Sequence, residues 1–153
     1  MRILLWPRAP VVARLLLAPT IPELLTSSTP VSTLLFDPLQ FLVSFAGIVG
    51  LYGTGALLIR ESTAAYRKGW GTVLLMGAAY GIAEEGVAVR TFFQLGGSPV
   101  DALGSYGHLF GVNWFWALGL TLFHATCSIG LPILLTGLWF SEVRGRRWMD
   151  RGR

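Results

Sequence analysis

The sequence predicts an all-α fold, a bundle of membrane-spanning helices that forms one integral membrane domain over residues 1–153. Hydrophobic residues make up 53% of the chain and charged residues only 13%, whereas soluble domains average about 25% charged residues. The mean hydropathy is +0.59, and apolar residues gather into runs long enough to cross a bilayer. Basic residues stand at the ends of these runs, so the net charge of +4 indicates orientation in a lipid bilayer and no nucleic-acid partner.

The first predicted span, over residues 9–25, is weak. Prolines and charged residues interrupt its apolar run: Pro10, Arg14, Pro19, Pro22 and Glu23. Arg2 and Arg8 precede the run as they would in a signal peptide, but no convincing small-x-small cleavage site follows. We expect a poor, kinked membrane helix here, and an interfacial hairpin is the alternative.

The second predicted span covers residues 39–59, which are nearly uncharged and long enough to cross the membrane. Asp37 stands where its carboxylate can cap the start of this helix. Small residues recur along one face of it: Ala46, Gly50 and Gly53. Because such a seam lets another helix approach closely, we expect this face to pack against a neighbouring helix.

The third and fourth predicted spans cover residues 70–93 and 114–140. Three basic residues precede the third span: Arg60, Arg67 and Lys68. The tail over residues 141–153 is rich in arginine, whereas the loop over residues 94–113 contains neither Lys nor Arg. Since basic residues favour the cytoplasmic side, four spans predict a multi-pass cell-membrane protein with both termini in the cytoplasm.

Two adjacent carboxylates, Glu84 and Glu85, lie inside the third predicted span. An ionised carboxylate near the middle of hydrocarbon costs at least about 2.5–3.5 kcal/mol, so an acidic pair there indicates a functional site by default. The alternative is that both glutamates hydrogen-bond a neighbouring helix and only stabilise the packing of the bundle.

The last predicted span carries a polar face around a histidine. The residues of this face recur at helical spacing: Thr121, His124, Ala125, Ser128 and Pro132. At 1.5 Å per residue, His124 lies about 15 Å from the outer end of its span, and the glutamate pair lies roughly 12–14 Å from the same face. We therefore expect His124 and the glutamates to share one site, although a lone membrane histidine often only satisfies a hydrogen bond.

Such a site has two chemical uses. Two close carboxylates do not both ionise readily, so one keeps a proton while the other can activate a water, with His124 exchanging protons. Alternatively, Glu84, Glu85 and His124 could hold a divalent metal ion that activates the water. The chain contains no His-Glu-x-x-His or Cys-x-x-Cys motif that would favour the metal. Its single cysteine, Cys127, excludes an intramolecular disulfide.

With Glu84-Glu85 followed by Arg90 and by a later membrane histidine, the chain resembles the CPBP family of CAAX-protease and bacteriocin-processing intramembrane enzymes. The resemblance implies a helical bundle that cuts a membrane peptide by glutamate-dependent hydrolysis. Glu84 and Glu85 would activate water, His124 would assist them, and His108 would be the second histidine. Four residues would support this site: Arg90, His108, Thr121 and Ser128.

Three positions depart from the family pattern. Arg90 stands one residue late for Glu-Glu-x-x-x-Arg, Leu120 replaces the phenylalanine of Phe-x-x-x-His, and Ser128 replaces the asparagine of His-x-x-x-Asn. The sequence segments over residues 53–61 and 111–116 resemble instead those of uncharacterised multi-pass prokaryotic membrane proteins.

Three functions are therefore open, and an intramembrane peptidase is expected first. In a transporter or an ion- or proton-binding subunit, the glutamates would carry protons or cations, and in a structural protein they would only join helices. Between Trp70 and Tyr80 only Thr72 is polar, so an inward polar path is poor and an enzyme is favoured. The expected partners are the bilayer, a membrane peptide substrate, and a partner helix or a second copy of the chain.

Overall fold

The structure, a computed structural model, describes residues 8–26, 32–94 and 106–148. Within these ranges the chain is helical apart from a short antiparallel hairpin of two strands, β1 (His108–Leu109) and β2 (Val112–Asn113), in which His108 pairs with Asn113. The predicted all-α class is confirmed.

The helices lie in four groups along the chain. The first is α1 (Ala9–Thr26). The second consists of α2 (Ser32–Phe36), α3 (Pro38–Ile48), η1 (Val49–Gly53) and α4 (Thr54–Ala65). The third group is α5 (Trp70–Gly81), η2 (Ile82–Ala88) and η3 (Thr91–Phe93). The fourth is α6 (Trp114–Phe123), η5 (His124–Gly130), α7 (Leu131–Trp139) and η6 (Ser141–Val143). Segments η1, η2 and η5 are π-helical turns that continue the α-helices beside them, whereas η3 and η6 are 3-10 turns.

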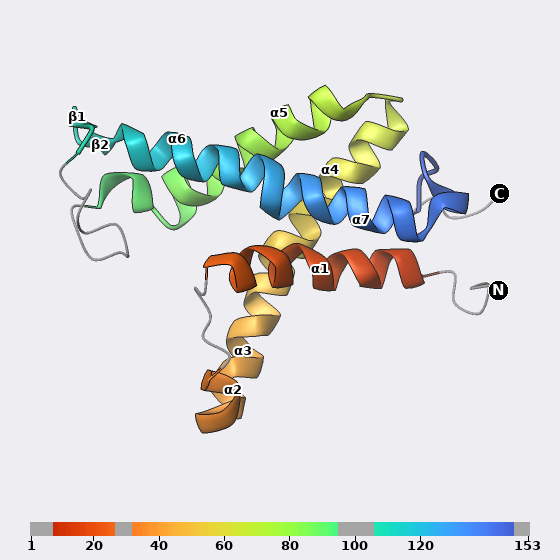
Figure 1. Cartoon of the computed structure of the whole chain (residues 1–153), viewed down its shortest axis with the longest axis horizontal. Helices are drawn as coiled ribbons and strands as arrows, with labels where there is room; N and C mark the ends of the chain where they lie inside the picture. Colours follow the sequence, from red (N-terminus) through yellow and green to blue (C-terminus); the bar gives the residue numbers. More distant parts are fainter. Residues whose placement is uncertain (1–7, 27–31, 95–105, 149–153) are drawn as a thin grey trace.

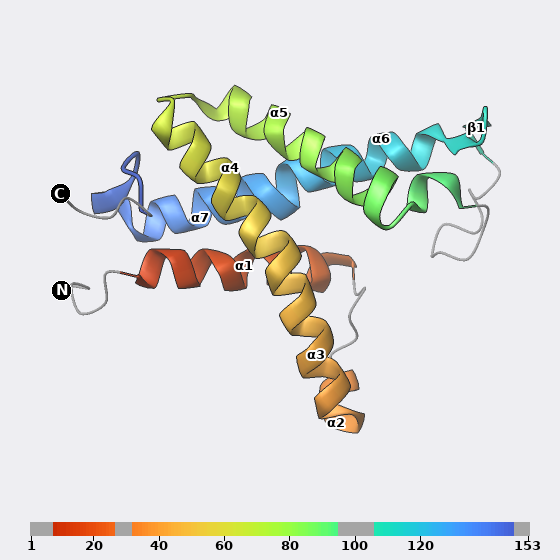
Figure 2. The same cartoon turned by 180° about the vertical axis from the view of Figure 1, so that it is seen from behind.

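Two long helices lie antiparallel at the centre of the molecule: α5 with η2, and α6 with η5 and α7 (Figure 1). Helix α1 runs alongside α7, and the helix formed by α3, η1 and α4 crosses over α1 (Figure 2). The first described residues of α1, the connection from α4 to α5 and the end of α7 lie at one end of the bundle (Figure 1). The β-hairpin lies at the other end.

Two helices in the described part of the chain are long and apolar enough to cross a membrane, judged by length and composition: Pro38–Ala65 with 28 residues and Trp114–Trp139 with 26 residues. They include the predicted spans 39–59 and 114–140. The expected third clear span, residues 70–93, is not confirmed, because two carboxylates lower its hydropathy and the continuous helix ends at Ala88. The weak run over residues 9–25 forms α1, which does not reach that standard either.

Local chemistry explains two of the helix ends. The Asp37 side chain accepts a hydrogen bond from the Gln40 backbone N–H at 3.0 Å, which confirms the predicted cap of α3. At the end of η2, Arg90 has a left-handed φ of 67°. Non-glycine residues rarely adopt this conformation, and it stops the helix before the predicted boundary at residue 93.

Close helix contacts depend on glycines. A Cβ atom added at Gly81 would lie 2.7 Å from the His124 Cβ, and one at Gly77 would lie 2.9 Å from the Ala125 Cα. Glycine at both positions therefore lets α5 and η5 approach closely enough to bring their polar residues together. Of the seam predicted on the second span, only Gly53 is in close contact, against the Leu15 backbone, while Gly50 has no such neighbour within 4 Å.

The buried apolar core lies between these helices. It consists of Ala18, Ala56, Ile59, Val73, Ile129 and Ile133. Helix α3, in contrast, has no buried residue. Its large apolar side chains, such as Leu39 at 72% exposure, form a surface that suits lipid contact.

Candidate functional site

A buried polar cluster forms where three helices change from α to π geometry. Tyr52 comes from η1, Glu84 and Glu85 come from η2, and His124 begins η5. A π-helical turn inserts an extra residue and so changes the direction of the side chains that follow, and such turns occur frequently at functional sites. The site therefore includes one distorted turn from each of three helices.

The imidazole of His124 lies between the two glutamates. Its Nε2 is 3.1 Å from the Glu85 Oε1, and its Nδ1 is 3.5 Å from the Glu84 Oε2. His124 is only 2% exposed, and Glu84 is only 4% exposed. The structure thus brings together the three residues that the sequence placed at one level, and their role in catalysis stays a prediction.

Glu85 is the more firmly held of the two carboxylates. Its Oε1 contacts His124, and its Oε2 accepts a hydrogen bond from the Thr91 hydroxyl. Thr91 reaches back to Glu85 because the left-handed Arg90 reverses the chain directly after η2. Both oxygens of Glu85 are therefore engaged, which fixes this carboxylate and, through it, the orientation of the imidazole.

Glu84 and the opposite side of the imidazole are less completely paired. Four buried polar atoms in this region have no hydrogen-bond partner among the described residues: Tyr80 Oη, Glu84 Oε2, His124 Nδ1 and Ser128 Oγ. An unpaired buried polar atom costs about 1–3 kcal/mol. Two of these atoms, Glu84 Oε2 and His124 Nδ1, face each other at 3.5 Å.

Aromatic rings enclose His124. The Tyr52 ring stacks on the imidazole at 5.8 Å between ring centroids, and the rings of Tyr80 and Phe123 meet it edge-on at 6.2 and 5.9 Å. Tyr52 and Tyr80 also lie within electrostatic range of Glu84. The sequence analysis assigned no role to either tyrosine, although Tyr80 stands one helical turn before Glu84 inside an apolar run, which was an available signal.

The predicted metal site finds no support in the described residues. The two imidazole nitrogens face different glutamates. In the described ranges, no group of three His, Cys, Asp or Glu side chains is arranged to hold a metal ion.

Three predicted supporting residues lie outside the cluster. Arg90 is exposed, His108 belongs to strand β1, and Thr121 lies one turn before His124 on α6. Among the described residues, none of them forms a hydrogen bond or an ion pair with the glutamates or His124. Ser128 is fully buried one turn after His124, and its hydroxyl has no hydrogen-bond partner among the described residues.

These features define a class: an integral membrane protein built from apolar helices around a buried acid–base cluster. The chain belongs to the family described as an uncharacterized membrane protein family, whose model matches residues 14–153. This match agrees with the resemblance to uncharacterised multi-pass membrane proteins and gives no support to the CPBP resemblance. No curated protein and no solved structure matches the chain.

Proposed function

We propose that the chain is an intramembrane hydrolase that uses Glu84, His124 and Glu85 to cleave an amide bond in a membrane peptide. The observation that supports this proposal best is the pair of facing atoms without hydrogen-bond partners among the described residues, Glu84 Oε2 and His124 Nδ1, which are 3.5 Å apart. A base and an acid side by side in a buried site are what activation of water requires.

We infer different roles for the two glutamates from their contacts. Glu85 holds the imidazole through Nε2 and is itself held by Thr91. This is the role of the third group that orients an acid or base in many hydrolytic sites. Glu84 has an oxygen that faces the imidazole without such a bond, so it is the better base.

A hydrolytic step can be written with these groups. Glu84 accepts a proton from water as the water oxygen bonds to the substrate carbonyl carbon. The C–N bond then breaks, and the imidazolium form of His124 donates a proton to the leaving nitrogen. The proton on Glu84 passes to His124 and restores both groups, so the net change is the addition of one water across the amide. Glu85 stabilises the imidazolium while it exists.

A second candidate function is a proton-binding carrier. One observation favours it: buried polar residues continue along the last helix from His124 through Ser128 to Thr136, which accepts a hydrogen bond from Arg14 on α1. The inward path that Trp70–Tyr80 lacks is thus partly supplied by another helix. In such a carrier the cluster would bind and release protons, and no covalent bond would break.

Heavy-oxygen water distinguishes the two functions. The full chain in nanodiscs is incubated in H₂¹⁸O with a defined mixture of single-span membrane peptides, and mass spectrometry detects fragments with ¹⁸O in a new carboxyl group. We expect labelled fragments from the natural protein. The rate at which they form should fall by about 10²–10⁴-fold in Glu84→Gln and should not change in the exposed control Glu142→Gln. Proton flux in liposomes that needs Glu84, without labelled fragments, would favour the carrier.

We also propose that α1 and the helix from α5 through η2 span the membrane with the two longer helices. This places both termini in the cytoplasm. The start of α1, the connection from α4 to α5 and the end of α7 lie at one end of the bundle (Figure 1). Arg8, Lys68 and Arg144 belong to or adjoin these segments in the sequence, as the orientation rule requires. A tag after Arg153 should resist an impermeant reagent in intact cells, and labelling of that tag would contradict the topology.

A further inference from the structure

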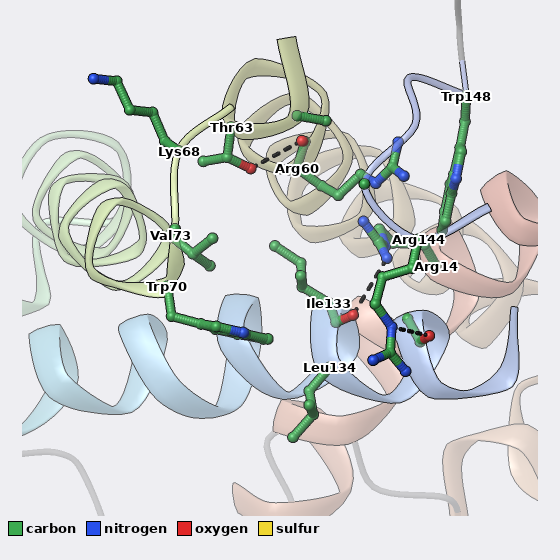
Figure 3. A pocket seen from close by; sticks show the side chains of 14 residues that line it. Arg14, Arg60, Thr63, Lys68, Trp70, Val73, Ile133, Leu134, Arg144 and Trp148 are labelled. Atoms are coloured by element: carbon green, nitrogen blue, oxygen red, sulfur yellow. Dashed lines mark hydrogen bonds between the residues drawn. The ribbon is translucent and has the colours of Figure 1, made fainter. Parts of the chain in front are cut away.

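A second polar site lies toward the end of the last helix, away from the glutamates. It is a cavity of about 220 Å³ between α1, α4, α5, α7 and the chain that follows α7 (Figure 3). Among the described residues, its lining holds four basic side chains and no acidic one. The basic residues are Arg14, Arg60, Lys68 and Arg144. In Figure 3 the guanidinium groups of Arg14 and Arg60 lie near Trp148, and the Lys68 amine extends away from them. The Arg144 Nε donates a hydrogen bond to the Gly137 carbonyl at 2.9 Å.

Arg14 is the most buried of these residues, at 1% exposure. Its Nε donates a hydrogen bond to the Thr136 hydroxyl at 3.0 Å, and its Nη2 reaches the same hydroxyl. Its Nη1 is buried and has no hydrogen-bond partner among the described residues. The guanidinium carbon lies 4.4 Å from the centre of the Trp148 ring. A charged donor is thus held in place at the cavity with one of its nitrogens unused.

A second buried guanidinium lies beside Arg14. Arg60 pairs with the buried Glu61, and its guanidinium carbon lies 3.8 Å from the centre of the Trp148 ring. Arg144 adds another positive charge at the cavity. Because a buried donor without a partner is costly, the Arg14 Nη1, unpaired among the described residues, favours an anion in this basic lining.

We propose that this cavity binds a phosphate group, carried either by the headgroup of an anionic phospholipid or by free phosphate. Guanidinium groups present paired N–H donors that match phosphate oxygens. Two tryptophans, Trp70 and Trp148, also line the cavity. Tryptophan and arginine together are typical of the level of the lipid headgroups, and basic pockets between membrane helices bind anionic headgroups.

The test uses a charge reversal at Arg144, because a change at the fully buried Arg14 could prevent folding. Arg144 is exposed and lines the cavity, whereas Arg146 is equally exposed and does not. The variants R144E and R146E thus change the net charge identically. The thermal stability of the full chain in uncharged detergent is measured during titration with phosphatidylglycerol or phosphatidylcholine. Potassium phosphate and potassium chloride are compared at equal ionic strength.

We expect phosphatidylglycerol to stabilise the natural protein and R146E at similar concentrations. R144E should need about 25-fold more phosphatidylglycerol. Each unit of positive charge near an anionic lipid surface contributes about fivefold in affinity, and the reversal changes the charge by two units. Stabilisation by potassium phosphate as well would identify free phosphate as a ligand, and stabilisation by the lipid alone would identify the headgroup. Equal effects of R144E and R146E would overturn the proposal. So would the absence of any preference for phosphatidylglycerol and for phosphate.

Discussion

Substitution of Gly81 by alanine tests the contact that brings the histidine to the glutamates. The new Cβ would lie 2.7 Å from the His124 Cβ and 3.2 Å from its ring, whereas carbon atoms in contact prefer about 3.5–4.0 Å. The two helices would have to separate by about 1 Å. Overpacking of this kind costs about 1–3 kcal/mol, while alanine in place of glycine in a helix returns about 0.5–1 kcal/mol. We expect a net loss of about 1–2 kcal/mol.

The control is Gly119→Ala on the facing helix α6, where an added Cβ would meet no other described element within 4 Å. It should raise the free energy of unfolding by about 0.5–1 kcal/mol through helix propensity alone. Both variants are compared with the natural protein by reversible unfolding in the same detergent. If Gly81→Ala stabilised the chain as much as Gly119→Ala, the close approach of α5 and η5 would be wrong, and with it the 3.1 Å contact between His124 and Glu85.

Two further substitutions test the polar partners. Thr136→Val removes the hydroxyl that accepts a hydrogen bond from the buried Arg14, so it should lower the free energy of unfolding by about 1–3 kcal/mol. Thr136→Ser keeps the hydroxyl and should lower this free energy much less. Equal losses in the two variants would assign the effect to packing. Thr91→Val removes one of the two hydrogen-bonding partners that fix Glu85, so it should reduce the rate of peptide cleavage. Thr91→Ser keeps the hydroxyl and should cleave at the natural rate. Full activity of the valine variant would show that Thr91 does not position the carboxylate.

Features set by neighbouring residues could be predicted from the sequence. The cap by Asp37 depends on a backbone N–H three residues away. The common level of His124 and the glutamates depends on the constant rise of a helix and on two antiparallel neighbours. The first expectation needed only the local sequence, and the second needed only the antiparallel order of two successive spans.

Features that depend on distant contacts could not be predicted. Arg14 interrupts an apolar run in the sequence, yet it is buried because Thr136, 122 residues away, accepts its hydrogen bonds. The left-handed Arg90 has no glycine or proline to announce the end of η2. The π-helical turns have no sequence period of their own, so the stacking of Tyr52 on His124 could not be inferred.

The central claim is that the buried acid–base cluster exists for function and is not only a device that joins helices. The most direct measurement is the free energy of unfolding of Glu84→Gln in detergent, beside that of the natural protein. The Glu84 oxygen that faces His124 has no hydrogen-bond partner among the described residues, and a buried charge needs compensation, so removal of this charge should leave the free energy of unfolding unchanged or raise it. A loss of about 1–3 kcal/mol, the cost of breaking a stabilising buried hydrogen bond, would contradict the claim.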